Sequence, residues 1–177
     1  MTPPYQPVND SRLNDLEFIG NGSVITDQIG DLISKTRLFG VLDRLDINLL
    51  ASYMGLYRTK DKDIILSEGE DGDYMLLLVE GSVDILKQDT QHCMKLITTI
   101  QPGTIVGEMA VVDGEKRFAT CITAEPSVFA VLTRDALVKI IDDEPKLGAK
   151  ILVQLLAMMS EHLRETGGKL VGYLKVN

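Results

Sequence analysis

The sequence is poor in cysteine and histidine, with two residues of each among 177. Cys93 and Cys121 lie far apart, form no CxxC pair and stand among apolar residues, so we expect buried, reduced thiols rather than a disulfide or a metal site. Reduced thiols are typical of the cytoplasm. The sequence therefore predicts a cytoplasmic protein without a metal centre.

Basic clusters and long apolar runs are also missing. The net charge is −8, and no group of Lys and Arg residues offers a surface for a phosphate backbone, which argues against direct nucleic-acid binding. The first 18 residues, MTPPYQPVNDSRLNDLEF, have neither the basic nor the apolar region of a signal peptide, and no apolar run approaches the length of a membrane span. We expect neither secretion nor insertion into a membrane.

The residue patterns of common catalytic sites do not occur either. Glu108, Asp113 and Glu115 are clustered carboxylates, but no histidine is near them in the sequence, no metal-ligand spacing occurs and no serine stands in a GxSxG context. His92 falls in the polar turn QDTQHC and His162 in a helical segment, where surface or interface histidines are common. We predict that the chain is not an enzyme and has no catalytic residue.

The spacing of the apolar residues predicts one domain with extensions. Residues 1 to about 22 are rich in Pro, Asn, Asp and Gly, and we expect a flexible N-terminal extension or a docking arm. Apolar residues at helical spacing predict a helix over 24–38 and another after Asp43, a good N-cap. We place the domain at 23–166 and a short tail at 167–177.

Between residues 56 and 133 the pattern changes to short β segments separated by turns that contain glycine. The segments are KDIILSEG, DYMLLLVEG, SVDILKQ, CMKLITTI, ATCITA and SVFAVLT. Many short strands at regular spacing indicate a sandwich, a barrel or a roll. The predicted fold is mainly β, with flanking α-helices.

Two helices are predicted after the β region, over about 134–166. Thr133 is a good N-cap for the first, and Pro145 starts a longer helix that we expect to end at Gly167 and Gly168. The apolar face of the long helix is wide enough for two partners. Its residues are Ile151, Leu152, Leu155, Leu156, Met158, Met159 and Leu163. One partner is the β region; the second is expected to be the same helix of another subunit, unless the domain's own core covers the whole face.

The segment PGTIVGEMAVVDGEKRFATCIT, residues 102–123, carries the chemistry of a ligand site. Gly107 precedes a short helical turn whose unpaired N–H groups suit a phosphate. Glu108 would repel a phosphate directly in front of it, but it suits a neighbouring sugar hydroxyl. Arg117 adds a charge-assisted partner for phosphate oxygens, and the small Ala119 leaves nearby N–H groups accessible. Together these groups indicate a nucleotide.

The sequence resembles the cyclic nucleotide-binding domain family, which includes the catabolite gene activator, the protein kinase A regulatory subunits and the nucleotide-gated channels. GEMAVVDGEKRFAT resembles the family's phosphate-binding cassette. The resemblance extends over residues 38–166, through LFGVLDRLDINLLASYM, EGEDGDYMLLLVEGSV, PGTIVGE and the final long helix. It implies a double-stranded β-helix, or jelly roll, with a long C-terminal helix. It also implies cAMP or cGMP as the ligand, with no cofactor.

The resemblance implies roles for single residues. Glu108 would hold the ribose 2′-hydroxyl and Arg117 the cyclic phosphate, while Thr166 would reach the base. Further phosphate contacts would come from the backbones of Gly107, Met109, Ala110, Phe118 and Ala119, and the base pocket would be lined by Ile85 and Ile97. The family usually has a proline before the arginine and a small residue after it, where this chain has Lys116 and Phe118. Phe118 either crowds the phosphate site or turns outward.

Three functions follow from the resemblance and remain open. The first is a cyclic nucleotide sensor that signals through its C-terminal helix to a second subunit or to an unidentified protein partner. The second is a scaffold for dimerisation or protein interaction that has the same fold and no ligand. The third is the sensor part of a transcription regulator, although only eleven residues follow Thr166 and no helix-turn-helix domain is visible.

Overall fold

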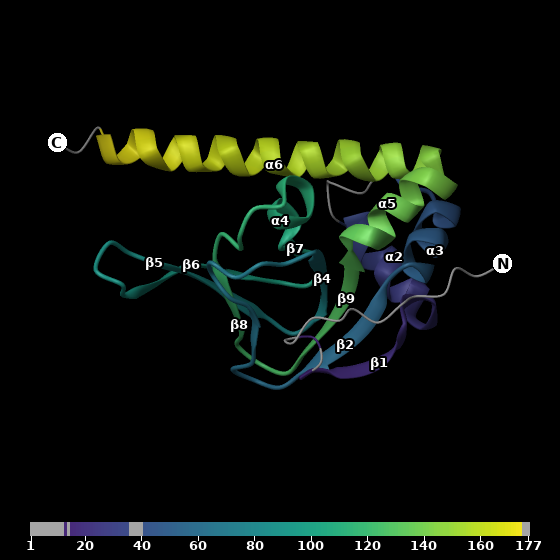
Figure 1. Ribbon diagram of the computed structural model, residues 1–177, viewed down its shortest axis with the longest axis horizontal. Helices are drawn as coiled ribbons and strands as arrows, with labels where there is room; N and C mark the ends of the chain where they lie inside the picture. Colours follow the sequence, from purple (N-terminus) through teal and green to yellow (C-terminus); the bar gives the residue numbers. More distant parts are fainter. Residues whose placement is uncertain (1–12, 14, 36–40, 175–177) are drawn as a thin grey trace.

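The computed structural model describes residues 13, 15–35 and 41–174. Two antiparallel sheets form a roll, and the long helix α6 (Pro145–Leu174) lies across it (Figure 1). No helix in these residues is long and apolar enough to cross a membrane. The predicted fold, a β-roll with flanking helices and a long final helix, is confirmed.

The strands form a five-stranded and a four-stranded sheet. The order in the first is β1 (Glu17–Asn21), β2 (Gly55–Thr59), β9 (Ser127–Thr133), β4 (Tyr74–Glu80) and β7 (Ile105–Val106). The order in the second is β3 (Ile64–Leu66), β8 (Thr120–Thr123), β5 (Val83–Gln88) and β6 (Met94–Ile100). Each of the six predicted β segments contains a strand, and β1, β2 and β7 are additional.

Strand β4 shows how an uninterrupted apolar run becomes a central strand. Successive side chains of a strand point to opposite faces, so the run YMLLLV serves two cores at once. Its side chains alternate between the core under the helices (Met75, Leu77, Val79) and the core between the sheets (Tyr74, Leu76, Leu78). This strand therefore joins the helical layer to the inside of the roll.

Capping residues set the starts of the helices. The helical segments of the described chain are η1 (Gly22–Ile25), α2 (Thr26–Lys35), α3 (Arg44–Ser52), α4 (Glu108–Asp113), α5 (Arg134–Asp143) and α6. Asp43 forms a capping box with Asp46, and Thr133 accepts a hydrogen bond from the N–H of Ala136, as expected of N-caps. Residues 36–38 of the first predicted helix lie outside the described residues.

The segment before the first helix packs against the roll, which corrects the prediction of a flexible extension up to about residue 22. Strand β1 pairs with β2, and Leu13 is buried in the core between the sheets. The ring of Phe18 lies 5.3 Å from that of Tyr57, edge to face. The apolar side chains of Leu13 and Phe18 therefore attach this segment to the roll, and residues 1–12 and 14 lie outside the described part.

Helix α6 continues through the two glycines that the sequence predicts to end it. Gly167 and Gly168 are helical, and α6 reaches Leu174. Neither glycine has the positive φ of a left-handed C-cap, and a Cβ on either would meet no atom within 4 Å. Glycine permits such a cap but does not impose it. The tail predicted at 167–177 is therefore helical as far as Leu174.

The two ends of α6 differ in what covers them. We call residues 145–158 the inner segment and residues 159–174 the outer segment. The inner segment buries Leu147, Ile151, Leu155 and Met158 against the helical core. In the outer segment residues 160–168 and Val171 are exposed. In Figure 1 the outer segment extends beyond the helices and over the side of the roll from which strands β5 and β6 project.

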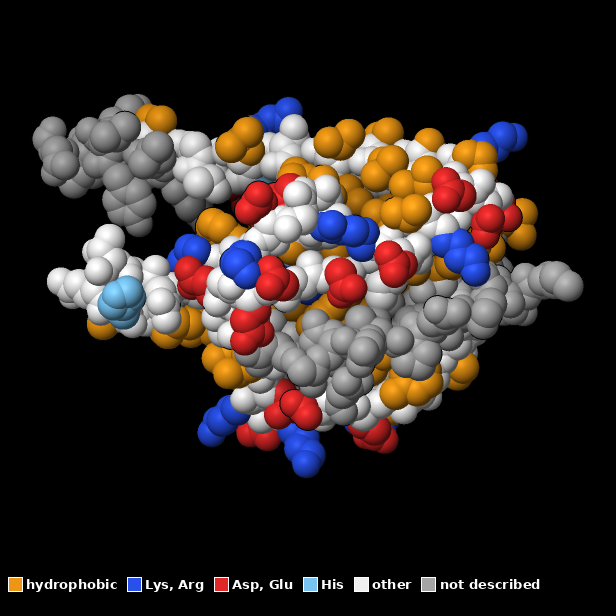
Figure 2. Space-filling model, in the orientation of Figure 1, with side chains coloured by type: hydrophobic (Ala, Val, Ile, Leu, Met, Phe, Trp, Pro, Cys, Tyr) orange, Lys and Arg blue, Asp and Glu red, His pale blue; other side chains and the backbone are white. Residues whose placement is uncertain are grey.

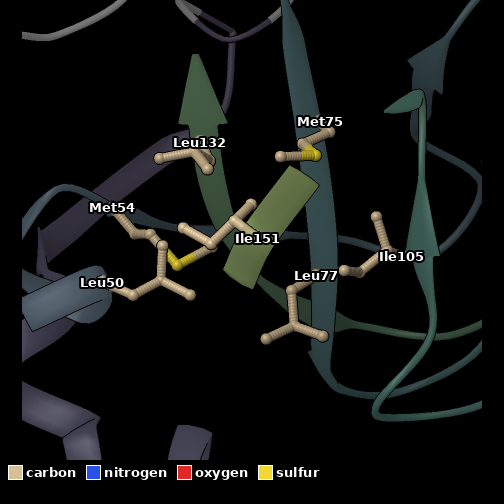
Figure 3. Close-up of a pocket in the computed structure, with 7 residues that line it drawn as sticks. All are labelled: Leu50, Met54, Met75, Leu77, Ile105, Leu132 and Ile151. Carbon is tan, nitrogen blue, oxygen red and sulfur yellow. The ribbon is translucent and has the colours of Figure 1, made fainter. Parts of the chain in front are cut away.

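A small apolar hollow lies between α3, the inner segment of α6 and the five-stranded sheet (Figure 3). It is lined by Leu50, Met54, Met75, Leu77, Ile105, Leu132 and Ile151. These side chains offer no hydrogen-bonding group of the kind that orients a nucleotide. The hollow is a gap in the packing of the core.

The two cysteines lie in different environments. Cys121 is buried, as predicted, and burial raises the pKa of its thiol to about 12. Cys93 is exposed, which corrects the prediction of a buried thiol. It lies in the turn of the β5–β6 hairpin, which projects from the roll (Figure 1), and its apolar neighbours Met94 and Leu96 are exposed as well. Apolar neighbours in the sequence do not bury a residue in a projecting hairpin.

Candidate functional site

Gly107 joins strand β7 to the short helix α4 in a conformation that favours glycine. Its φ is +81°, and a Cβ there would lie 2.7 Å from Nη1 of Arg117 and 3.2 Å from the carbonyl oxygen of Tyr74. No side chain among the described residues caps the start of α4. Because the first N–H groups of a helix have no intrahelical acceptor, this end of α4 can receive an anion.

Arg117 is buried beside this helix end, with 5% of its surface exposed. Its Nη1 donates to the carbonyl oxygen of Gly107 at 2.9 Å, and its Cζ lies 4.6 Å from the centroid of the Tyr74 ring. Its Nη2 is buried and has no hydrogen-bond partner among the described residues. A buried guanidinium N–H without an acceptor costs free energy, so an anionic oxygen beside this nitrogen would be stabilised.

A turn with two glycines positions Arg117. The backbone N–H of Arg117 donates to the carbonyl oxygen of Glu70 at 2.8 Å, and its carbonyl oxygen accepts from the N–H of Gly69 at 2.9 Å. A Cβ on Gly72 would lie 2.2 Å from Nε of Arg117. The turn therefore fixes the backbone of Arg117, and Gly72 leaves the space that the guanidinium needs.

Glu108, the first residue of α4, is buried to the same degree, with 5% exposed. Its Oε1 lies 3.6 Å from Nδ1 of His162 on α6, which passes over α4 (Figure 1). The Glu108 carboxylate raises the pKa of His162. Glu108 and Arg117 also both act electrostatically on the buried thiol of Cys121. Because Nη1 of Arg117 donates to the carbonyl oxygen of Gly107, the residue before Glu108, the carboxylate and the guanidinium both belong to the start of α4.

Phe118 turns outward, which decides between the two positions that the sequence leaves open. It is 56% exposed, and Nζ of Lys87 lies 4.2 Å from the centroid of its ring. The same Nζ donates to the carbonyl oxygen of Phe118 at 2.5 Å and to Oε1 of Glu68 at 2.7 Å, which lowers the pKa of Glu68. Lys116 pairs with Asp71 at the surface, at 2.8 Å. Neither replacement of the family's usual residues fills the site.

The predicted residues differ in how far the structure encloses them. The cassette residues Gly107, Glu108, Met109, Ala110, Arg117, Phe118 and Ala119 lie together, on α4 and just before β8. Ile85 is half-buried on β5, opposite Cys121, and Ile97 is 46% exposed in β6. Thr166 is exposed on the outer segment of α6. The cassette residues are thus brought together, whereas Ile85 is half-buried and Ile97 and Thr166 are exposed.

Three side chains that shape this site were not among the predicted site residues: Tyr74, Lys87 and His162. Tyr74 and Lys87 come from β4 and β5, which the fold brings beside Arg117 and Phe118, and no local pattern marks them. His162 precedes Thr166 by four residues, so both lie on one face of the helix. That spacing was the available signal for His162.

A family model and a solved structure both match this chain. The sequence model of the cyclic nucleotide-binding domain matches residues 58–144. The crystal structure of a cyclic nucleotide-binding domain from Methylobacillus flagellatus KT is 33% identical, covers 93% of both chains and has a TM-score of 0.84. The chain belongs to the cyclic nucleotide-binding domain family. The match of 58–144 includes the whole cassette and ends just before α6.

Other relatives of this cyclic nucleotide-binding domain are regulators. The CRP-like cAMP-activated global transcriptional regulator of Mycobacterium tuberculosis is 28% identical over 106 residues, which are 60% of this chain and 46% of that protein. A cAMP-dependent protein kinase regulatory subunit of Colletotrichum orbiculare is 32% identical over 133 residues, which are 71% of this chain and 31% of that one. The chain spans less than half the length of these curated relatives.

Proposed function

We propose that this domain binds a cyclic nucleotide, cAMP or cGMP, and signals its occupancy through the outer segment of α6. The observation that carries the proposal is the buried pair of Glu108 and Arg117 at the start of α4, with the Nη2 of Arg117 lacking an acceptor among the described residues. A guanidinium beside a helix start suits a phosphate, and a carboxylate suits a sugar hydroxyl. This chemistry is that of binding rather than catalysis.

The proposal assigns a role to each predicted residue. Arg117 holds the cyclic phosphate and Glu108 the ribose 2′-hydroxyl. The remaining phosphate contacts come from backbone groups of Gly107, Met109, Ala110, Phe118 and Ala119, and the base lies near Ile85, Ile97 and Thr166. The cassette reads only the phosphate and the ribose, which cAMP and cGMP share. The cAMP-related names of the relatives in Mycobacterium tuberculosis and Colletotrichum orbiculare support a cyclic nucleotide of this class.

Arg134 supports a path from the cassette to α6. Its guanidinium donates to the carbonyl oxygen of Ala110 on α4, and its backbone N–H donates to the carbonyl oxygen of Asp73 at 2.6 Å. Arg134 is the first residue of α5, and α5 packs against α6. A shift of α4 on a bound phosphate therefore acts directly on the helix that precedes α6.

A second copy of the chain is the proposed partner of the exposed apolar side chains of α6, which lie on both its inner and its outer segment. Leu152, Leu156 and Leu163 are exposed on this helix, at 37%, 64% and 75%, and Figure 2 shows hydrophobic side chains along α6. With Met159 their spacing is four, three and four residues, which is the spacing of a coiled-coil seam. The proposed sensor is a homodimer, and a further protein partner binds to it in response to nucleotide occupancy.

Calorimetric titration with cAMP, cGMP and linear 5′-AMP tests the proposed ligand. We expect both cyclic nucleotides to bind more tightly than 5′-AMP. Arg117→Ala should weaken cAMP binding by about ten- to a hundredfold, because it removes a charge-assisted phosphate contact. Lys116→Ala is the matched control, because Lys116 pairs with Asp71 at the surface, and it should change the affinity by less than about twofold.

Two results would count against the proposal. Unchanged affinity in Arg117→Ala would contradict the assigned phosphate site. Absence of binding by cAMP and cGMP in the unaltered protein would contradict the sensor function and favour the ligand-free scaffold.

A further inference from the structure

His162 links the outer segment of α6 to the cassette. Its Nδ1 lies 3.6 Å from Oε1 of Glu108, and its side chain is 53% exposed whereas that of Glu108 is 6% exposed. Among the ion pairs of the described residues, this is the one that joins the outer segment to α4. The outer segment is otherwise exposed at its described positions from 160 onward. This ion pair therefore joins the cassette to a helix segment whose described side chains are mostly exposed.

The groups that face His162 favour its charged form. Glu108 faces it from α4, and Glu161 and Glu165 act on it from its own helix. Arg117 lies at the same helix start, where its Nη1 donates to the carbonyl oxygen of Gly107. Three carboxylates near one imidazole stabilise the imidazolium, so the pKa of His162 is raised, with Glu108 as the first cause.

The burial of Glu108 has a consequence for any ligand that needs it. A ribose hydroxyl must approach within hydrogen-bond distance of the carboxylate, of which 6% is exposed. The group that can give way most readily is His162, because it is half-exposed and stands on the outer segment. The ribose and the imidazole are then alternative partners of one carboxylate.

We propose that His162 is a positioning residue that holds Glu108 in the empty site and must yield it to the ribose of the nucleotide. The inference rests on the proposed function and adds His162 as a competitor of the ribose for the Glu108 carboxylate. It makes nucleotide binding depend on pH, and it means that the ligand exchanges one contact of the outer segment of α6, that of His162 with Glu108, for the contact of Thr166 with the base.

The direction of the pH effect follows from the charge of His162. The contact stabilises the empty site fully below the ordinary pKa of histidine, about 6.5, and is lost as the pH rises through the raised pKa. A nucleotide that replaces the contact releases a proton in this range. Affinity for cAMP should therefore be lower at about pH 6 than at about pH 8.

Calorimetric titration with cAMP at about pH 6 and about pH 8 tests the inference, with His162→Gln as the variant. At pH 6 the variant should bind about two- to fivefold more tightly than the unaltered protein, and at pH 8 the two should be equal. The matched control is His92→Asn, which removes the other histidine of the chain, in the exposed turn of the β5–β6 hairpin. It should keep the pH dependence of the unaltered protein.

An NMR titration of the histidine rings gives a second readout that a merely structural role would not move. Saturating cAMP should lower the pKa of His162 toward its ordinary value. A pKa that stays or rises, or a His162→Gln variant that keeps the pH dependence, would overturn the inference while leaving cAMP binding in place. If no variant binds cAMP or cGMP at either pH, the proposed function fails and this inference fails with it.

Discussion

The two segments of α6 differ in what holds them, although they form one continuous helix. In the inner segment Ile151 and Leu155 are 1% and 2% exposed, within the core formed with the sheet and the other helices. In the outer segment Leu163 and Val171 are 75% and 51% exposed, and His162 provides the link to the cassette. The comparison teaches that the fold buries one end of the helix and leaves the other end exposed, and it is this exposed end on which the proposed ligand, proton and partner act.

The largest expected effect is a loss of stability on substitution in the inner segment. Ile151→Ala should lower the free energy of unfolding by about 2 to 4 kcal/mol, because the vacated volume adds to the apolar hollow that Ile151 borders (Figure 3). Val171→Ala, the control in the outer segment at a side chain that is 51% exposed and lies off the proposed seam, should change it by less than about 0.5 kcal/mol. Urea unfolding measures both. Equal losses for the two variants would mean that the helix is fixed along its whole length.

A smaller effect is expected on the association of the proposed subunits. Leu156→Glu places a carboxylate on the exposed apolar seam of α6, where a second copy would bury it, so the dimer should dissociate at least about tenfold more readily. Analytical ultracentrifugation measures the dissociation constant. The matched control is Leu45→Glu, at a leucine of α3 that is 78% exposed, and it should leave the dimer intact. A protein that sediments as a monomer before any substitution would contradict the proposed dimer.

Local sequence patterns predicted the parts of the fold that depend on local physics. The alternation of strands, the N-caps Asp43 and Thr133 and the start of α6 at Pro145 are all visible in the sequence. The predicted end of α6 at Gly167 and Gly168 was wrong, because a glycine permits a helix end without requiring one. The packing of β1 was missed because its partner β2 is more than thirty residues away in the sequence.

The candidate site divides in the same way. Glu108 and Arg117 stand in one short motif, so the sequence could mark them. Tyr74 under Arg117 and Lys87 over Phe118 come from other strands, and only the closure of the roll brings them there. The contact of His162 with Glu108 spans more than fifty residues and depends on where α6 passes over α4.

Hydrogen exchange of the protein with and without saturating cAMP tests the central claim most directly, because it reports on both segments of α6 at once. The account predicts slower exchange in residues 107–119, altered exchange in the outer segment and unchanged exchange in the inner segment. Bound cAMP that changes exchange in the cassette alone, with the outer segment as before, would contradict signalling through this helix.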